Sequence, residues 1–221
     1  MTATVTVGID IGTTNSKVGI FSENGSQLRV VSRPTETLRD EALGIACYDP
    51  ERMWNSLYSA LREALEPLGD VHVASIGIAS MAESGLLVER STGEPRSPFM
   101  PWFDTCSEPQ AARIRSESDP FERFAASGLH GSFKLGLAKI LWLRDHVPQS
   151  LAGGDPVWIS AAGWIAFKLT GRYAFDDSLA ARTYAYRIDR REWDAPWLRH
   201  FGLSSELFPE VTAGGRPIGG V

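Results

Sequence analysis

The ten residues GIDIGTTNSK, at positions 8–17, decide the fold that the sequence predicts. A strand-like run ends in Asp10, and a turn of glycine, threonine, asparagine and serine separates it from a second strand-like run that begins at Lys17. Residues 28–33 form a third such run, and the Asn24-Gly25 pair before it favours a tight hairpin. We therefore expect the chain to begin with a meander of three antiparallel strands over 5–10, 17–22 and 28–33.

The rest of the chain mixes helix and strand patterns. Residues 50–65 place apolar side chains at helical spacing and predict an amphipathic helix, whereas residues 73–80 and the segment from Ser84 to Pro95 have the composition of strands. Further helices are expected within 107–118, 121–128, 134–147 and 160–171, with Gly128 and Gly171 as helix ends. This order predicts an α/β fold, a mixed five-stranded sheet with flanking helices.

Composition narrows the function. The chain has 221 residues, 43% hydrophobic and 22% charged, so it can bury a full core. A net charge of -5 argues against nucleic acids and membrane surfaces as partners, and the two cysteines lack the spacing of a zinc site or a disulfide framework. Neither a signal peptide nor an apolar run of membrane-spanning length is evident. We expect a cytoplasmic protein that acts on a small molecule.

The turn after Asp10 has the composition of an anion site. Successive backbone N–H groups and hydroxyl groups can line a concave turn, which suits the phosphates of a nucleotide. Asp10 is placed to hold Mg²⁺ through water, and Lys17 adds a nearby positive charge. A Walker motif is absent, and a plain polar turn explains the spacing equally well. The candidate phosphate contacts are Gly12, Thr13, Thr14, Asn15 and Lys17.

Five segments, taken in order, resemble the FGGY carbohydrate kinases, within the sugar kinase and actin superfamily. The first is GIDIGTTNSK, which looks like the hairpin that wraps the β and γ phosphates of ATP in that superfamily. The resemblance extends to a Trp-x-Asp motif, a helix containing LAKILW, an LTG segment and a final helix that leads to Phe208-Pro209. These later segments lie at 76–104, 137–148, 167–183 and 191–211.

The resemblance implies an RNase-H-like fold in two domains, with ATP, Mg²⁺ and a sugar bound between them. Residues 1–221 match the first domain, and the family's proton-accepting aspartate lies beyond the segment that resembles the end of this chain. We therefore expect the N-terminal half of an ATP-dependent carbohydrate kinase, inactive without its C-terminal domain, and we leave a homo-oligomer open. A non-catalytic sugar- or nucleotide-binding module of the same fold is the alternative.

The resemblance also implies three substrate residues, Glu83, Trp102 and Asp104. Carboxylates accept hydrogen bonds from vicinal hydroxyls, and a Trp face covers the apolar side of a sugar. Two anionic groups would repel a carboxylate, which favours a neutral ketose or polyol unless an arginine compensates. The segment MAES, 81–84, matches typical glycerol kinases only at Glu83 and lacks the Gln-Met-His of typical xylulose kinases, so the sugar is not specified.

Each of these residues also has an ordinary structural interpretation. Glu83 could be a solvated loop residue, Trp102 a core residue, and Asp104 the N-cap of the helix expected near Ser107. Lys139 and Lys168 are expected on helix surfaces. A local charge cluster is expected from Asp176 and Asp177 with Arg172 and Arg182.

Overall fold

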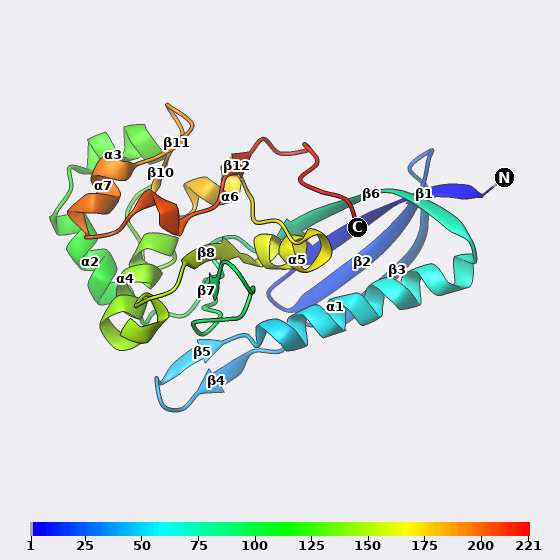
Figure 1. The fold of residues 1–221 in the computed structure, drawn as a ribbon, viewed down its shortest axis with the longest axis horizontal. Coiled ribbons are helices and arrows are strands. Elements are labelled where there is room, and N and C mark those ends of the chain that lie inside the picture. Colours follow the sequence, from blue (N-terminus) through cyan, green and yellow to red (C-terminus); the bar gives the residue numbers. More distant parts are fainter. Residues whose placement is uncertain (1) are drawn as a thin grey trace. The chain divides into compact units, whose positions relative to one another are not determined.

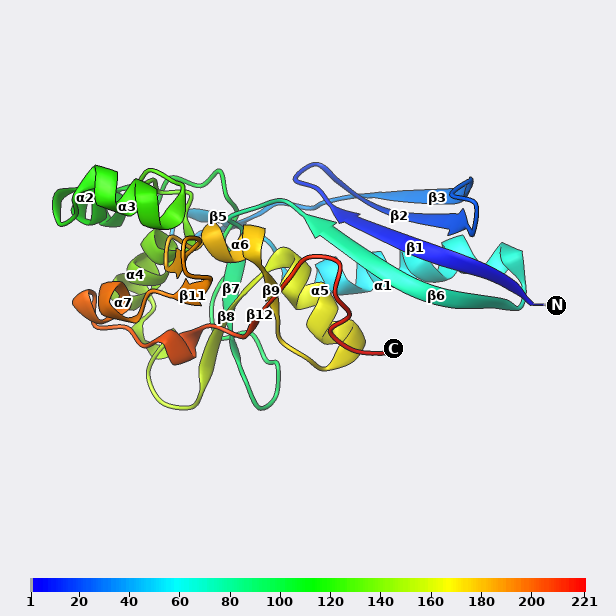
Figure 2. The same ribbon diagram turned by 90° about the horizontal axis from the view of Figure 1, so that it is seen from above.

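The computed structural model describes residues 2–221, which divide into two compact units. The first unit comprises the residues up to 37 together with 49–81. The second unit comprises 38–48 together with 82–221. Figures 1 and 2 show the elements of both units.

The first unit is built on a four-stranded mixed sheet, with the order β3-β2-β1-β6. Strands β1 and β2, and then β2 and β3, pair antiparallel, so the expected meander is confirmed. The fourth strand, β6, runs parallel to β1 along its other edge. The strands span Ala3–Ile11 (β1), Asn15–Ser22 (β2), Gln27–Pro34 (β3) and Val71–Ser80 (β6).

Helix α1, Pro50–Leu65, packs against β2 and β3 of this sheet (Figure 1). The carboxylate of Asp49 caps its N-terminus by accepting a hydrogen bond from the Arg52 N–H, and proline occupies the first helical position. The buried face carries the helical spacing that the sequence predicted, and a short 3₁₀ helix, Glu66–Leu68, follows. The buried residues are Met53, Leu57, Ala60, Leu61 and Ala64.

The prediction of a five-stranded sheet was wrong by one strand. The segment expected as the fifth strand forms β7, Gly85–Glu89, which pairs antiparallel with β8, Pro156–Ser160, in the second unit. Residues 85–88 of β7 and 157–160 of β8 are all buried. A strand buried on both faces carries no alternation that would tell which sheet it joins.

The second unit gathers short strands and helices around α4, Gly136–His146, whose residues 136–143 are all buried. Glycines in the left-handed conformation end α3 and α5, at Gly128 (φ 72°) and Gly171 (φ 69°), as predicted. The other helices are α2 (Glu108–Ser116), α3 (Pro120–Ser127), α5 (Ala161–Thr170), α6 (Asp177–Ala181) and α7 (Ala195–His200), with 3₁₀ turns at Pro148–Ser150 and Ser205–Leu207.

Three small strand pairs complete this unit, and Figure 2 labels β5, β9, β11 and β12 among their strands. They join β4 (Leu38–Asp40) with β5 (Ile45–Cys47), β9 (Phe175–Asp176) with β12 (Val211–Thr212), and β10 (Tyr186–Arg187) with β11 (Glu192–Trp193). Among the residues that the structure describes, no helix has the length and apolar character needed to cross a bilayer.

Candidate functional site

The turn between β1 and β2, residues 12–14, is held from one side by Thr35. The Thr35 hydroxyl donates to the Gly12 carbonyl at 2.8 Å, and the Thr35 N–H donates to the Thr14 carbonyl at 2.9 Å. Ser16 Oγ lies 2.9 Å from the same hydroxyl. Since Thr35 follows β3, this contact ties the turn to the third strand of the meander.

The bound carbonyls determine where the N–H groups of the turn point. The Ile11 carbonyl accepts from the Met81 N–H at 2.7 Å, in addition to the two bonds from Thr35. The C=O and N–H of a trans peptide lie on opposite sides of the bond, so the N–H groups of Gly12, Thr13 and Asn15 are directed away from these donors. A row of backbone N–H groups with this orientation suits an anion.

Gly12 is required by the tightness of the turn. A Cβ atom built at this position would lie 2.4 Å from the Asn15 carbonyl oxygen, well inside van der Waals contact. Asp10 and Lys17 are both exposed and face each other in the β1–β2 register, so their charges lie beside the turn. Residues 2–221 contain no group of three or more His, Cys, Asp or Glu side chains that could hold a metal ion. A lone exposed carboxylate fits Mg²⁺ held through water and phosphate oxygens.

Glu83, in the second unit, has a strained backbone and a paired side chain. Its φ angle of 61° is unusual for a residue other than glycine. Its carboxylate accepts a hydrogen bond from Arg182 Nη1 at 3.1 Å, and its side chain is only 13% exposed. The interpretation as a solvated loop residue was therefore wrong. Residues held in such conformations concentrate at functional sites.

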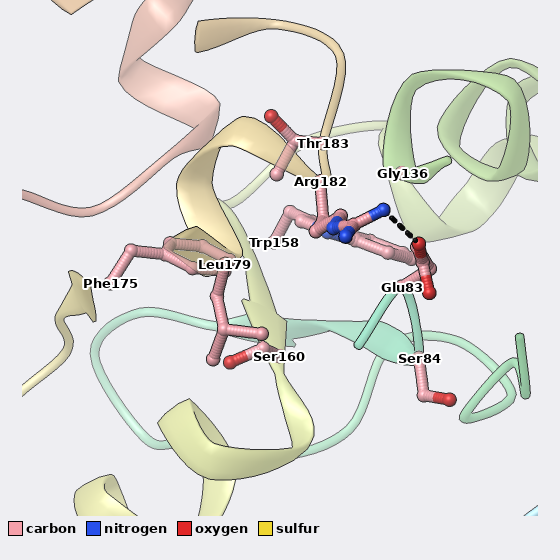
Figure 3. A pocket seen from close by; sticks show the side chains of 9 residues that line it. All are labelled: Glu83, Ser84, Gly136, Trp158, Ser160, Phe175, Leu179, Arg182 and Thr183. Atoms are coloured by element: carbon pink, nitrogen blue, oxygen red, sulfur yellow. Dashed lines mark hydrogen bonds and ion pairs between the residues drawn. The ribbon is translucent and has the colours of Figure 1, made fainter. Parts of the chain in front are cut away.

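The Glu83–Arg182 pair lines a small hollow (Figure 3). The guanidinium reaches toward the carboxylate, and the rest of the lining mixes polar side chains with the apolar side chains of Trp158, Phe175 and Leu179. The lining residues are Glu83, Ser84, Gly136, Trp158, Ser160, Phe175, Leu179, Arg182 and Thr183.

Trp102 is joined to this hollow through its backbone, because its N–H donates to Ser84 Oγ at 3.0 Å. The indole is half-buried, with the Lys134 ammonium 5.1 Å from the ring centroid. It is therefore neither a fully buried core side chain nor a solvated one. Phe103 packs edge-on against the same ring.

Asp104 binds two backbone N–H groups, those of Ala46 at 2.7 Å and Cys106 at 2.8 Å, one on each carboxylate oxygen. Neither N–H belongs to α2, which begins after Ser107, so the expected helix cap was wrong. A carboxylate offers about four acceptor positions, so each oxygen keeps capacity for a ligand hydroxyl. Burial and the neighbouring Asp104 raise the pKa of the Cys106 thiol to about 12, so this thiol stays protonated.

Lys139 was expected on a helix surface and is instead fully buried. Its ammonium donates to the carbonyl of Phe133 at 3.3 Å and to that of Lys134. Loss of hydration lowers its pKa from 10.5 to about 8, and Cys106, Glu83 and Asp104 oppose that shift by favouring the charged form. Lys139 thus interacts electrostatically with Glu83, Asp104 and Lys134. We call the group of Glu83, Trp102, Asp104, Lys134, Lys139 and Arg182 the Glu83 cluster.

With both sites described, the comparisons with known proteins identify the family. Residues 5–221 match the model of the FGGY family of carbohydrate kinases, N-terminal domain. The chain belongs to this family. The glycerol kinase of Thermus brockianus is 32% identical to this FGGY domain over 214 residues, and that of Aquifex aeolicus (strain VF5) is 28% identical over 212. The matches cover 93% and 94% of this chain but 43% and 42% of the two relatives.

Solved structures share the fold of this FGGY domain. The xylulose kinase from Rhodospirillum rubrum matches with a TM-score of 0.88 at 22% identity, over 96% of this chain and 43% of that one. The Plasmodium falciparum glycerol kinase with ADP matches with a TM-score of 0.87 at 23% identity, over 95% and 43%. The chain thus spans less than half the length of the kinases that it matches.

Among residues 2–221, the expected charge cluster of Asp176 and Asp177 with Arg172 and Arg182 does not form. Asp176 caps α6, and Asp177 pairs with Arg191 at 2.9 Å, while Arg182 turns to Glu83. Charged side chains that are adjacent in sequence need not contact the same neighbours, because successive side chains at the start of a helix point in different directions.

Sequence reasoning missed four residues that shape the two sites. Thr35, Lys134 and Arg182 carry no local signal, because their partners lie far away along the chain. Lys139 did carry one, since apolar residues flank it on both sides in LAKILW. A helix that is apolar all round is a buried helix, and a lysine within it is then buried too.

Proposed function

We propose that this FGGY domain is the N-terminal, phosphate- and carbohydrate-binding part of an ATP-dependent kinase that phosphorylates a carbohydrate hydroxyl. The observation that carries the proposal is the match to the FGGY N-terminal domain over 5–221. The two sites described above support it, since one suits an anion and the other suits hydroxyl groups. Residues 1–221 would form one such domain, with an RNase-H-like fold, and the kinase's C-terminal domain would be its partner.

In this proposal the β1–β2 turn holds the phosphates of ATP. Backbone N–H groups and hydroxyls of the turn bind the phosphate oxygens, and Lys17 offsets their charge. Asp10 holds Mg²⁺ through water. ATP and Mg²⁺ together supply a phosphoryl group whose negative charge is neutralised, so positioning carries most of the catalysis. The turn residues concerned are Gly12, Thr13, Thr14 and Asn15.

Glu83, Trp102 and Asp104 bind the carbohydrate. The carboxylate of Glu83 accepts from a substrate hydroxyl while Arg182 holds it in place, and Asp104 accepts a second hydroxyl on its remaining lone pairs. Trp102 covers apolar C–H groups. The family's proton-accepting aspartate is expected beyond residue 221, so phosphoryl transfer requires that segment.

The preference for a neutral ketose or polyol depended on two unpaired carboxylates. In the structure Glu83 pairs with Arg182, and each oxygen of Asp104 has a backbone N–H partner. The electrostatic reason for excluding an acidic sugar is therefore weaker than the sequence suggested.

The test is calorimetric titration of the chain with MgADP and then with a panel of ketoses, polyols and sugar acids. We expect millimolar or tighter binding, about -4 kcal/mol or better, to both ligand classes. Glu83→Ala should abolish carbohydrate binding and spare MgADP, and Gly12→Ala should do the opposite. Glu122→Ala, at an exposed position on α3, is the matched control and should change neither. If each of the two site variants lost binding of both ligands, the proposal of two separate sites would be rejected.

A non-catalytic binding module remains the alternative, and turnover separates it from a kinase. Carbohydrate-dependent formation of ADP from MgATP, measured with the chain extended to the length of its relatives, supports the kinase. Binding of both ligands without ADP formation supports the module.

A further inference from the structure

Lys134 is the cation of the Glu83 cluster whose ammonium has neither a carboxylate nor a carbonyl partner among residues 2–221. Its ammonium lies 5.1 Å from the Trp102 ring centroid and 6.0 Å from that of Phe133, and it forms no ion pair with any carboxylate in residues 2–221. Lysine ammonium groups are strongly hydrated and prefer an anionic partner when one is available. The position of this cation beside Trp102 therefore needs an explanation.

The other charges of the cluster already have partners. Glu83 is bound by Arg182 at 3.1 Å, and Asp104 by the N–H groups of Ala46 and Cys106. Lys139 is buried and donates to the carbonyls of Phe133 and Lys134. The cluster therefore offers a ligand one uncompensated positive charge. Beside it lie the carboxylates of Glu83 and Asp104, which can accept hydrogen bonds from hydroxyl groups.

The backbone of Lys134 is held in place, so its ammonium is not carried on a loose loop. Its N–H donates to Ser132 Oγ at 3.4 Å, and its carbonyl accepts from the buried Lys139. The carbonyl of the preceding Phe133 accepts from Ser107 Oγ at 2.8 Å. These bonds keep the start of the Lys134 side chain beside Trp102.

We propose that the carbohydrate bound by the Glu83 cluster is a sugar acid, a polyhydroxy carboxylate whose anionic end is bound by Lys134. This inference rests on the proposed carbohydrate site and adds the charge of its substrate. An ammonium–carboxylate hydrogen bond is about twice as strong as one between neutral groups. The hydroxyls of the same ligand face Glu83 and Asp104, and its C–H groups pack on Trp102.

The test uses two ligands that differ only at one end. D-gluconate and D-glucitol share a six-carbon chain of hydroxyls, but gluconate ends in a carboxylate where glucitol ends in a neutral CH₂OH. We expect the chain to bind gluconate about tenfold more tightly than glucitol at low salt, a ratio that falls as salt screens the exposed charge. Isothermal titration at two salt concentrations measures the ratio.

Two variants of Lys134 separate charge from packing. Lys134→Met keeps the apolar stem on Trp102 and should reduce the gluconate-to-glucitol ratio to about one, whereas Lys134→Arg should keep most of it. The matched control is Lys168→Met, because the Lys168 ammonium also lies 5.1 Å from an indole, that of Trp164, outside the Glu83 cluster. That variant should leave the ratio unchanged.

The outcomes distinguish this inference from the proposed function. Glucitol binding as tightly as gluconate, or a Lys134→Met variant that weakens both ligands equally, overturns the sugar-acid inference and leaves the carbohydrate site intact. Failure of every carbohydrate to bind, with MgADP binding retained, rejects the carbohydrate site and this inference together.

Discussion

The β1–β2 turn and the Glu83 cluster are built in opposite ways. The turn is a contiguous segment whose shape comes from backbone hydrogen bonds and one close glycine contact, with Thr35 and Met81 as its outside supports. The Glu83 cluster collects side chains from four separated stretches of the chain and joins them through an ion pair, a buried ammonium and a cation beside an indole.

This difference sets how each region should respond to change. A site made of backbone groups is sensitive to added side-chain volume. Its N–H groups are insensitive to pH, because main-chain N–H groups do not titrate. A site made of charged side chains on a buried framework is sensitive to the loss of a partner and to pH, since a buried group without its partner pays the full cost of dehydration.

The largest effect should come from breaking a buried ion pair in the second unit. Arg123 and Asp194 pair with side chains only 9% and 5% exposed, and Arg123 also lies over the Trp197 ring. Arg123→Met leaves Asp194 buried without its main partner and should lower the free energy of unfolding by about 3–5 kcal/mol. Chemical denaturation measures the loss.

The first unit supplies the control for that experiment. Arg33 pairs with Glu63, but these side chains are 32% and 50% exposed. Arg33→Met should therefore cost less than about 1 kcal/mol. Equal losses in the two variants would contradict the argument that charged side chains on a buried framework are the ones sensitive to the loss of a partner.

Added volume should disrupt the β1–β2 turn. Gly12→Ala brings a methyl group against the Asn15 carbonyl and should cost about 2–3 kcal/mol, with MgADP binding lost as the turn opens. Gly8→Ala, in β1 before the turn, meets only the Phe21 side chain at 3.5 Å and is the control. Retention of full MgADP affinity in Gly12→Ala would show that the tight turn is dispensable.

The pH response should come from Lys139. Its pKa is lowered by burial from 10.5 to about 8, so between these values the unfolded chain holds more protons than the folded one and stability rises with pH. Lys139 should add about 2 kcal/mol to the free energy of unfolding between pH 8 and pH 10. Cys106 should remove part of this gain above pH 9.0, because burial holds its thiol protonated in the folded chain while the thiol of the unfolded chain ionises. Denaturation across that range measures the slope.

Lys139→Met should remove this rise in stability with pH and leave the opposing effect of Cys106. Lys134→Met is the matched control, since the Lys134 side chain is not buried among apolar neighbours in α4. The range ends at pH 10 because burial raises the pKa values of Tyr173 and Tyr186 to about 12. At higher pH these groups therefore ionise first in the unfolded chain, and stability falls. An unchanged slope in Lys139→Met would assign the pH response to another group.

The smallest effect concerns the support of the turn. Thr35→Val removes the hydroxyl that donates to the Gly12 carbonyl and should cost about 1 kcal/mol, with MgADP affinity reduced severalfold. Thr37→Val, at an exposed position on the same connection, should change neither quantity. Thermal melts and titrations of the two variants, run side by side, make the comparison.

The parts that could be predicted from sequence depend on neighbours in the chain. The three-stranded meander follows from strand patterns joined by short turns, and α1 follows from its apolar spacing and the Asp49-Pro50 start. The GIDIGTTNSK segment predicted the tight turn between β1 and β2 for the same reason, because Gly12 and Asn15 lie three positions apart. That the turn binds an anion stays a prediction. The helix ends at Gly128 and Gly171 could also be predicted, because a helix end in the left-handed conformation favours glycine at that one position.

Tertiary structure alone decided what each side chain of the second unit meets. Sequence patterns identified β7 as a strand, but its partner β8 begins 71 positions after it, and Asp104 binds an N–H that is 58 positions away. Whether Arg182 balances Glu83, and whether Lys139 is buried, depend on such distant pairings. Local sequence determines backbone conformation through sterics and short-range hydrogen bonds, whereas the charge and burial of a site depend on which distant segments the packed core brings together.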